Sequence, residues 1–359
     1  MIDFLVIGGG IAGISAGARL SHLGRVVLLE VETGLGYHAS GRSAALFEVH
    51  YGSVAGLALN EVSRDYHMTA NGGVLSPRGI MLVGGIGQEE QFERDRAKMS
   101  FDKISIDEAR GHVPILNPET MVAAAYREDS WDIDTDRLIQ NFAKEIRANG
   151  GEVRTSARVE QIVRTANGWQ VTAGGDTLEA RILVDAAGAW ADEVARMAGV
   201  MPLGLQPMRR SMARLPAPGG LDISRWPMIL AAGEDWYAKP DAGKLLVSPA
   251  EEDPVEPHDA WADDMVLAEG LARYEAMVTE PVTRLETSWA GLRTFTSDRQ
   301  PALGFAADDP AFLWVAGQGG SGFQCAPAAS QLVADLVAGR EPEVSKDIVK
   351  AVDPARLQP

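Results

Sequence analysis

The sequence contains a single cysteine, Cys325, in 359 residues. One thiol can form neither a disulfide within the chain nor a multi-cysteine metal cluster, so we predict no metal site and a reducing compartment. No stretch reaches the ~18–20 apolar residues of a membrane span. The first apolar run, Phe4–Ile7, is too short for a secretory signal. We therefore expect a cytoplasmic protein without a transmembrane segment.

Basic residues are also scarce. Thirty-three Lys and Arg residues stand against 50 Asp and Glu, which gives a formal net charge of −17 at pH 7. A general nucleic-acid binder needs a basic face to neutralise phosphates, so we expect no nucleic-acid partner. Hydrophobic residues make up 46% of the chain, which excludes a disordered protein, and the length suits two domains or one large domain with an insertion.

The N-terminal residues predict a β-α-β unit. Phe4–Ile7 and Val26–Leu29 are short apolar strands, and Ile11–Leu23 between them has the pattern of a helix that Gly24 ends. Such a unit is typical of a parallel sheet.

The turn between the first strand and the helix carries the motif Gly8-x-Gly10-x-x-Gly13. In this context Gly8 permits a tight turn, Gly10 lets a pyrophosphate approach the backbone, and Gly13 lets helix and strand pack closely. Glu30, at the end of the second strand, is placed to accept a hydrogen bond from a ribose 2′-hydroxyl. The motif therefore predicts FAD or NAD rather than NADP.

A second glycine cluster favours FAD. Gly317 to Gly322 again joins a strand, Phe312–Ala316, to a helix, predicted over Ala326–Ala338. The positive end of that helix dipole would suit a ring that becomes anionic, such as a reduced flavin. Two helix N-termini far apart in the sequence match a long cofactor with two polar ends.

Several stretches, most of them outside the glycine motif, carry a family resemblance. They are LVIGGGIAGISAG at 5–17, GYHASGRSAA at 36–45, LVDAAGAW at 183–190, LGLQPMRRS at 203–211, SWAGLRTF at 288–295 and VAGQGGSGFQ at 315–324. Through them the chain resembles the D-amino acid oxidase (DAO) superfamily of flavoproteins. Within it, the chain looks most like the bacterial D-arginine and D-amino acid dehydrogenases.

The resemblance implies an α/β fold with two domains. One is a discontinuous, Rossmann-like FAD-binding domain at 1–75, 138–205 and 289–359. The other is an α+β substrate-binding domain at 76–137 and 206–288, built on a mostly antiparallel sheet that covers the flavin.

The resemblance also implies the residues around FAD. It assigns to the cofactor site Gly8, Gly10, Ile11, Ala12, Gly13, Glu30, Arg42, Ser43, Ala44, Val159, Ala187, Gly188, Trp190, Gly319, Gly320, Gly322, Phe323 and Gln324. Some relatives attach the flavin through a cysteine, but the corresponding stretch near Thr296 and Ser297 has none. We therefore expect FAD to be bound noncovalently.

Four residues are expected to form the catalytic site. Arg210 and Arg293 match the pair that holds the substrate carboxylate, as planar, permanently charged guanidinium groups can do. Arg209 is adjacent and remains an alternative to Arg210. Tyr51 and Tyr237 match positions where phenol hydroxyls contact the bound amino acid.

The substrate side chain is expected to meet apolar residues. Leu46 and Ile80 stand where D-arginine dehydrogenases carry a histidine and an acid, and the resemblance also assigns Gly320 to substrate binding. A buried guanidinium without a partner loses several kcal/mol of binding, so we expect D-arginine to be a poor substrate. Glu48, in the same loop as Leu46, is the one residue that could serve a cationic side chain instead.

The implied activity is oxidation of a D-α-amino acid to its imino acid, by hydride transfer from Cα to flavin N5, with apolar or aromatic side chains preferred. Two alternatives share the fold. One is oxidation of a secondary amine such as sarcosine, proline or an opine; the other is a flavin subunit of an electron-transfer complex. The residues do not distinguish dioxygen from a quinone as electron acceptor, and they do not determine the oligomeric state.

Overall fold

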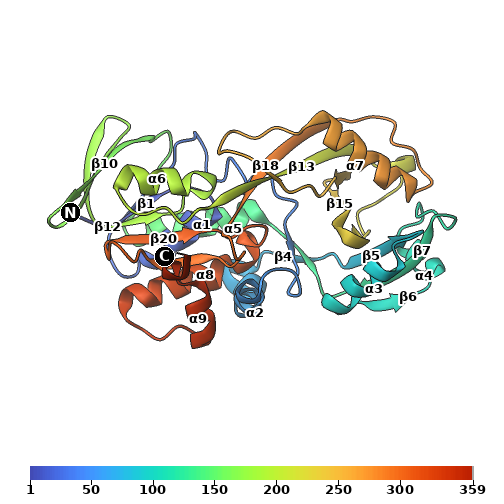
Figure 1. Cartoon of the computed structure of the whole chain (residues 1–359), viewed down its shortest axis with the longest axis horizontal. Helices are drawn as coiled ribbons and strands as arrows, with labels where there is room; N and C mark the ends of the chain where they lie inside the picture. The colour runs from blue at the N-terminus through green and yellow to red at the C-terminus, as the bar shows by residue number, and fades with distance from the viewer. Residues whose placement is uncertain (358–359) are drawn as a thin grey trace.

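The computed structural model describes residues 1–357, which form two lobes side by side (Figure 1). Both chain ends lie in the same lobe, and the long strands β13 (Gln206–Pro216) and β18 (Thr287–Phe295) run between that lobe and the other. We refer to the lobe with the chain ends as the cofactor lobe and to the other as the substrate lobe.

The cofactor lobe is built on an eight-stranded sheet. Its strands are β1 (Ile2–Ile7), β2 (Val26–Leu29), β9 (Glu152–Arg154), β10 (Val159–Thr165), β11 (Gly168–Ala173), β12 (Asp176–Asp185), β19 (Ala302–Phe305) and β20 (Phe312–Ala316). The order β9-β2-β1-β12-β20 is parallel throughout, whereas β10, β11 and β19 pair antiparallel at the margins. The predicted Rossmann-like arrangement is confirmed.

Helices cover the faces of this sheet. They are α1 (Ile11–Leu20), α2 (Val54–Thr69), α5 (Thr135–Ala148), α6 (Ala191–Ala198), α8 (Gly322–Ala338) and α9 (Lys346–Val352), with short 3-10 turns at η1 (Ala70–Gly72), η2 (Gly188–Trp190) and η5 (Pro354–Leu357). Helix α8 begins a full turn before the predicted Ala326, and Gly339 ends it in the left-handed conformation.

Helix α2 was not among the predicted elements. Its N-terminal signal is nevertheless present, because the Ser53 side chain accepts a hydrogen bond from the Gly56 amide at 3.2 Å. The buried face of α2 is polar as well as apolar, with Asn60, Ser63 and His67 fully buried against α8. This mixture hides the helical period of the sequence.

The substrate lobe contains a nine-stranded sheet. Besides β13 and β18, its strands are β5 (Ile80–Gly85), β6 (Asp102–Ile104), β7 (Met121–Arg127), β14 (Met228–Ala231), β15 (Tyr237–Asp241), β16 (Lys244–Ser248) and β17 (Asp253–Pro254). Helices α3 (Glu89–Lys98), α4 (Ile106–His112) and α7 (Asp264–Ala276) and the turns η3 (Pro218–Gly220) and η4 (Ala232–Glu234) complete the lobe. All these strand pairs are antiparallel except β14 with β5.

The predicted domain boundary at residue 289 falls inside strand β18. This strand pairs with β13 over nine register positions and so extends the sheet of the substrate lobe. The stretch is apolar and adjoins the cofactor lobe, so its sequence does not reveal which sheet takes its hydrogen bonds.

A small third sheet lies between the lobes. It consists of β3 (Leu46–Phe47), β8 (Trp131–Ile133) and β4 (Leu75–Pro77), in that order. Through β8 this sheet fixes the segment that follows the predicted flavin loop, because Leu46 pairs with Asp132 and Phe47 with Trp131.

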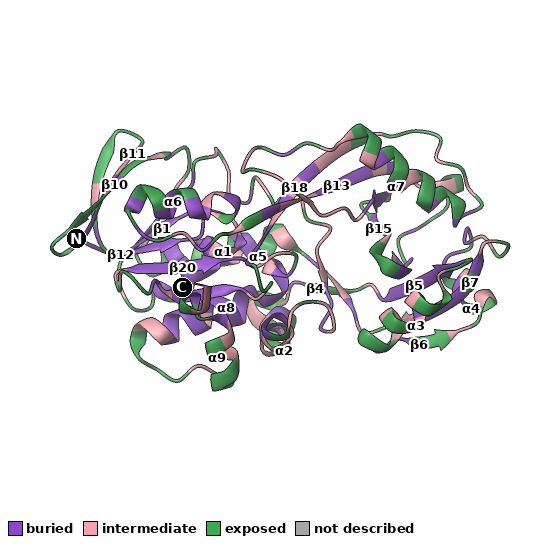
Figure 2. Cartoon of the chain, viewed as in Figure 1, coloured by how far each residue is buried: buried purple, intermediate pink, exposed green. Residues whose placement is uncertain are grey.

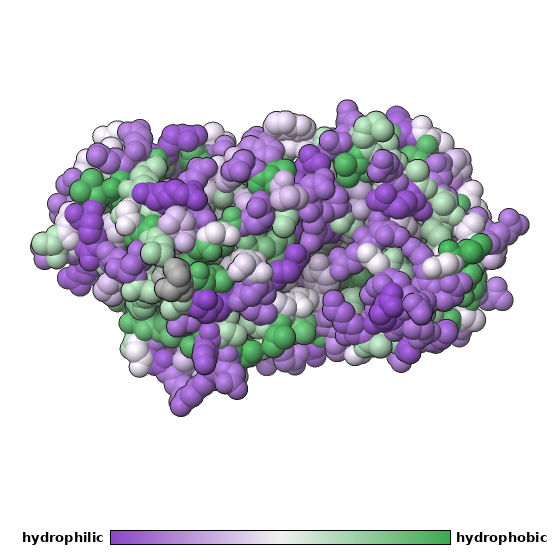
Figure 3. Space-filling model, in the orientation of Figure 1, coloured by the Kyte–Doolittle hydropathy of each residue, from purple (hydrophilic) through white to green (hydrophobic). Residues whose placement is uncertain are grey.

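Burial follows the two main sheets. The strands β1, β12 and β20 and the helix α8 form the buried interior of the cofactor lobe, whereas α3 and α9 present exposed faces (Figure 2). The face in Figure 3 carries mostly hydrophilic side chains, with scattered apolar ones. None of the helices within residues 1–357 is long and apolar enough to cross a bilayer.

The buried His67 gives the fold a pH dependence. Burial lowers the pKa of this imidazole to about 4, and its Nε2 lies 2.9 Å from the Gln324 carbonyl oxygen. His67 therefore becomes protonated near pH 6.5 in the unfolded chain but only near pH 4 in the folded chain. The free energy of unfolding falls as the pH drops through this window. We expect His67 to account for about 2 kcal/mol of lost stability at pH 5 relative to pH 8.

Thermal unfolding of His67→Gln should test this, because an amide can still donate to the Gln324 carbonyl but does not titrate. The melting temperature of the variant should fall less than that of the wild type between pH 8 and pH 5. The exposed His22, changed to Gln, serves as the matched control and should leave the wild-type slope unchanged. Parallel curves for wild type and His67→Gln would contradict the assignment.

Candidate active site

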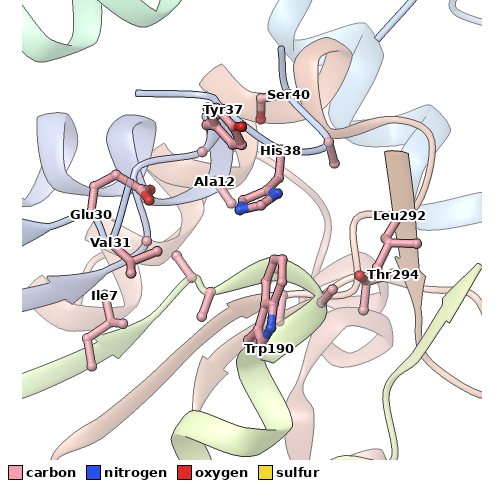
Figure 4. A pocket seen from close by; sticks show the side chains of 18 of the residues that line it. Ile7, Ala12, Glu30, Val31, Tyr37, His38, Ser40, Trp190, Leu292 and Thr294 are labelled. Carbon is pink, nitrogen blue, oxygen red and sulfur yellow. The ribbon is translucent and has the colours of Figure 1, made fainter. Parts of the chain in front are cut away.

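The larger of two adjoining cavities, about 490 Å³, opens where strands β1, β2, β12 and β20 end at the same edge of the parallel sheet. Ile7, Leu29, Ala186 and Val315 line it from those strand ends. Figure 4 shows Glu30, Tyr37, His38 and Trp190 around the cavity. Ligands of open α/β sheets bind at this carboxyl edge, so the cavity is the candidate cofactor site.

The three glycines of the motif have the roles that their spacing predicts. Gly8 has a φ of +107°, and a Cβ there would lie 2.4 Å from the Ala186 carbonyl oxygen. A Cβ on Gly13 would lie 2.0 Å from the Gly8 carbonyl oxygen, and this clash would prevent α1 from packing on β1. Gly10 faces the cavity, and a Cβ there would meet only the Ser40 hydroxyl, at 3.3 Å. Gly13 therefore acts through packing and does not line the cavity.

Glu30 is buried and held rigidly at the cavity wall. Its Oε2 accepts a hydrogen bond from the Gly9 amide at 2.6 Å, and its Oε1 accepts one from the Glu32 amide at 2.8 Å. Each carboxylate oxygen keeps a further lone pair, so the group can still accept from a ribose hydroxyl.

Two helix N-termini meet at this cavity. Helix α1 begins there at Ile11, and helix α8 begins there at Gly322, next to Gly319. The N-cap residue of α8, Ser321, makes no side-chain cap. Helix N-termini attract anionic groups. The open Gly10 cradle and the two termini fit a dinucleotide with a central pyrophosphate, and the residues present therefore suit FAD.

The cavity wall includes three aromatic rings in edge-on and tilted contact. The His38 ring lies 4.7 Å from that of Trp190 and 5.0 Å from that of Tyr37, measured between centroids. His38 Nε2 also lies 3.0 Å from a Glu32 carboxylate oxygen. Only Trp190 of these residues was predicted to line the site, because the GYHAS loop has no regular period.

A loop from the substrate lobe reaches the mouth of the cavity. His258, Asp259 and Ala260 line it, and Arg42 ties the loop to the cofactor lobe. Arg42 donates to the carbonyl oxygens of Ala260 at 2.9 Å and Ala290 at 3.0 Å, and its Nη2 lies 2.5 Å from Asp259 Oδ1. The Arg42 guanidinium lowers the pKa of the Asp259 carboxyl.

The structure brings most predicted cofactor residues to the two cavities. Gly8, Gly10, Ile11, Ala12, Glu30, Arg42, Val159, Ala187, Gly188, Trp190, Gly319 and Gly322 line the larger one, and Ser43, Ala44, Gly320 and Phe323 line its smaller neighbour. The predicted cofactor residue Gln324 lies apart from the others. It lines neither cavity, because its side chain turns toward the loop after β3 and accepts from the Glu48 amide at 2.7 Å.

The smaller cavity brings Arg210, Tyr237, Arg293 and Gly320 together. Strand β13 supplies Arg210 and strand β18 supplies Arg293, and their register places Arg210 opposite Gly291 and Arg293 opposite Met208. Directly opposite residues of an antiparallel pair share a face, so both guanidinium groups point to the same side of the sheet.

Strand β18 separates the two cavities. Gly291 and Arg293 line the smaller cavity, whereas Leu292 and Thr294 line the larger one. Successive side chains of a strand point to opposite faces, and here each face belongs to a different site. Consecutive residues of β18 therefore line the two cavities in turn.

Arg293 stands out because part of its guanidinium has no partner. Its Nη1 is buried and, among residues 1–357, has no hydrogen-bond acceptor. Burial lowers the pKa of Arg293, but the electrostatic influence of Tyr51 and Tyr237 raises it, and the net shift is upward. The glycine at position 320 keeps the space beside this nitrogen open, because a Cβ there would lie 3.1 Å from it.

Arg210 and Arg209 point in opposite directions. The buried Arg210 lines the smaller cavity and is fixed by the Glu251 carbonyl oxygen at 2.8 Å and Glu252 Oε1 at 3.2 Å. Arg209 instead donates to Asp253 Oδ2 at 2.7 Å on the other face of β13. Of the two, only Arg210 faces the cavity.

The two predicted tyrosines differ in position. Tyr237 is buried at the cavity, with the Arg210 guanidinium carbon 5.8 Å from its ring centroid. Tyr51 lines neither cavity and packs against the apolar cluster of Ile80, Leu82 and Phe92.

Three other predicted substrate residues do not line the cavity. Ile80 is buried in an apolar cluster with Leu82 and Phe92, and Leu46 packs against that cluster. Glu48 is buried and forms an ion pair with Arg127, so its carboxylate is already partnered. Burial nevertheless raises the pKa of Glu48. Ile80 and Leu46 form a layer behind the cavity, because Met228 and Leu230 pack both on the Ile80 cluster and on the cluster that contains Met212 and Tyr237.

Met212 and Lys239 are among the residues of the substrate end that the sequence analysis missed. Met212 lines the smaller cavity on the same face of β13 as Arg210, and the period of two could have revealed it. Lys239 is buried, and its ammonium donates to the carbonyl oxygens of Ala44 and Ala45 at 3.0 and 2.8 Å. Its charge is balanced by Asp132 at 2.9 Å, so it anchors the predicted flavin loop.

We expect the contact between Arg42 and Asp259 to slow the escape of the cofactor. Asp259→Asn should release FAD about two- to fivefold faster at low salt, as the loss of a largely exposed ion pair allows, and the difference should shrink at high salt. Recovery of flavin fluorescence after dilution measures the rate. Asp309→Asn removes another 2.5 Å ion pair, with Arg164, and is the matched control. Equal release from Asp259→Asn and wild type at low salt would refute the expectation.

Comparison with known proteins yields the same fold. A 24% identical relative, the glycine oxidase of Bacillus licheniformis, is matched over 94% of this chain and 93% of its own length. The crystal structure of glycine oxidase from Geobacillus kaustophilus superimposes with a TM-score of 0.84 at 22% identity, covering 99% of this chain and 98% of that one. That of L-proline dehydrogenase from P. horikoshii also gives 0.84, at 20% identity and the same coverage.

The particular likeness to D-arginine dehydrogenase is not supported by these relatives, whereas the family is. The model of the family described as FAD dependent oxidoreductase (DAO) matches residues 3–336, almost the whole chain. This chain belongs to the DAO family of FAD-dependent oxidoreductases.

Proposed function

We propose that this enzyme oxidises an α-amino acid that it binds by the carboxylate, and that D-amino acids with apolar or aromatic side chains are preferred. The observation that carries the proposal is the buried, unpartnered Nη1 of Arg293, which faces the cavity next to the cofactor site. A buried cationic donor without an acceptor is costly, so the site favours an anionic ligand.

The side chains around that donor suit an amino acid. Arg210 lies on the same face, which provides a second guanidinium for the carboxylate. Tyr237 offers a phenol hydroxyl beside it, and Met212 offers an apolar contact to a substrate side chain. Among the described residues, the lining of this cavity holds no carboxylate that could pair with a cationic side chain, which favours apolar substrates.

The reaction needs position more than acid–base catalysis. FAD, when bound, accepts the hydride that leaves Cα. The arginines and tyrosines hold the carboxylate so that the Cα–H bond faces the cofactor, and the nitrogen lone pair of a neutral amine forms the C=N bond as the hydride departs. The imino acid then hydrolyses in water. No general base among these residues is required.

A secondary amine is the second candidate. Its support is the fold shared with L-proline dehydrogenase, at a TM-score of 0.84, together with a carboxylate site that would accept any α-carboxylate. The preference for the D configuration has its origin in the family resemblance.

Anaerobic reduction of the bound flavin distinguishes the candidates. We expect apolar D-amino acids to bleach the oxidised-flavin absorbance, and D-arginine, L-amino acids, sarcosine and proline to leave it. Bleaching by sarcosine or proline alone would replace the main proposal with the second candidate. No bleaching by any carboxylate would refute both.

The carboxylate role of Arg293 can be tested separately. Arg293→Met should raise KM for the best substrate about 10- to 100-fold, because a charged hydrogen bond to the substrate is lost. Arg209→Met, on β13 but facing Asp253, is the matched control and should change KM by less than about threefold. An equal effect of both variants in steady-state kinetics would contradict the assignment of Arg293.

A further inference from the structure

Glu48 and Arg127 form a buried ion pair between the lobes. Glu48 follows β3 and is 3% exposed; Arg127 ends β7 in the substrate lobe and is 9% exposed. The Arg127 Nη2 contacts Glu48 Oε1, and its Nη1 donates to the Met99 carbonyl oxygen. A buried pair costs desolvation of both charges, so it contributes little stability that an apolar pair would not also give. This cost suggests a purpose other than stability.

The pair fixes the turn that carries Tyr51. Glu48 Oε1 also accepts a hydrogen bond from the His50 amide at 2.8 Å, and the Glu48 carbonyl oxygen accepts one from the Tyr51 amide at 3.3 Å. From the other side, the Gln324 side chain of α8 accepts a hydrogen bond from the Glu48 amide. Arg127 therefore reaches Tyr51 through a short chain of contacts, and Tyr51, which is expected to contact the bound amino acid, packs against the apolar cluster of Ile80.

The pair also adjoins the apolar residues expected around the substrate. Arg127 lies directly opposite Ile80 in the pairing of β5 with β7. Ile80 belongs to the cluster against which Leu46, Tyr51 and Met228 pack. Glu48 is thus a carboxylate at the apolar end of the site, and Arg127 supplies the guanidinium that occupies it.

We propose that Arg127 is a positioning and specificity-determining residue: it holds the Tyr51 turn through Glu48 and, as an internal cation, withholds the Glu48 carboxylate from substrates with cationic side chains. The proposal rests on the proposed function, since it concerns the side-chain end of the same site. Glu48 would otherwise be the natural partner of a guanidinium or ammonium group.

Arg127→Ala leaves a space the size of a guanidinium beside the buried Glu48 carboxylate and the more exposed Asp129 carboxylate, which both lose this partner. We expect KM for the best apolar substrate to rise about tenfold with a smaller change in kcat, because Tyr51 loses its support. The ratio of kcat/KM for D-arginine to that for the apolar substrate should rise at least about tenfold. Added methylguanidinium should lower the raised KM again.

Thermal unfolding gives a readout that does not need turnover. Methylguanidinium should raise the melting temperature of Arg127→Ala by about 2 °C or more and leave that of the wild type unchanged, because only the variant has a free site for it. In the double variant Glu48→Gln/Arg127→Ala both the rescue and the shift should disappear, since a neutral amide holds the cation weakly.

Two further variants keep the result interpretable. Arg96 also reaches the segment after α3, donating to the Phe101 carbonyl oxygen at 3.2 Å, but it pairs with Glu93 rather than Glu48. Arg96→Met therefore controls for loosening of that segment and should show neither the rescue nor the change in ratio. If Arg127→Ala does not fold, Arg127→Lys should fold, raise KM for the apolar substrate and gain no activity on D-arginine.

The outcomes separate this inference from the proposed function. A wild-type enzyme that bleaches with no amino acid refutes the proposed function, whereas the methylguanidinium shift in Arg127→Ala can still appear. A wild type that oxidises apolar amino acids, with Arg127→Ala showing unchanged KM, no thermal shift and no change in ratio, overturns the inference. A shift that persists in the double variant also overturns it, because the cation would then bind elsewhere.

Discussion

The pairing of β13 with β18 is the constraint on which the rest of the site depends. It places Arg210 and Arg293, 83 positions apart in the chain, on one face at neighbouring register positions. The opposite face of β18 presents Leu292 and Thr294 to the larger cavity. A slip of one residue would exchange these faces, because the side-chain period of a strand is two. The same hydrogen bonds thus set both the substrate clamp and its distance from the cofactor.

The segment from Arg42 to Tyr51 is held in place from both lobes. Arg42 binds the loop at Asp259, Lys239 binds the carbonyl oxygens of Ala44 and Ala45, and β8 pairs with β3. The Arg127 side chain then takes the Glu48 carboxylate. Four contacts thus hold these ten residues in place. The conformation of the segment depends on both lobes, so a change in either lobe can shift the site.

Buried charge distinguishes structural groups from functional ones in this molecule. Lys239 and Arg127 are both buried, and both are paired with carboxylates: Lys239 with Asp132, and Arg127 with Glu48 and Asp129. Arg293 differs, because its buried Nη1 has no acceptor and no carboxylate among the described residues pairs with its guanidinium. An unpaired cationic donor in a low dielectric is tolerated where a ligand completes it. That contrast, rather than the mere presence of arginines, identifies the anion site.

The sequence by itself determined the β-α-β unit, the separate tasks of Gly8, Gly10 and Gly13, and the second glycine turn before α8. These features are local: a tight turn, a close backbone approach and a helix start depend on neighbouring residues, and their signals survive in a short window. The presence of an FAD site follows from them together with the family resemblance.

Only the tertiary structure decided which side chains meet at the substrate end. Arg210 faces the cavity and Arg209 does not, because β13 presents its even positions there. Glu48, a candidate for a cationic substrate, meets Arg127 from the other lobe, and the missed Lys239 meets a loop 195 residues away. Such contacts depend on strand register and on the docking of the lobes, which join residues far apart in sequence and leave no period in the chain.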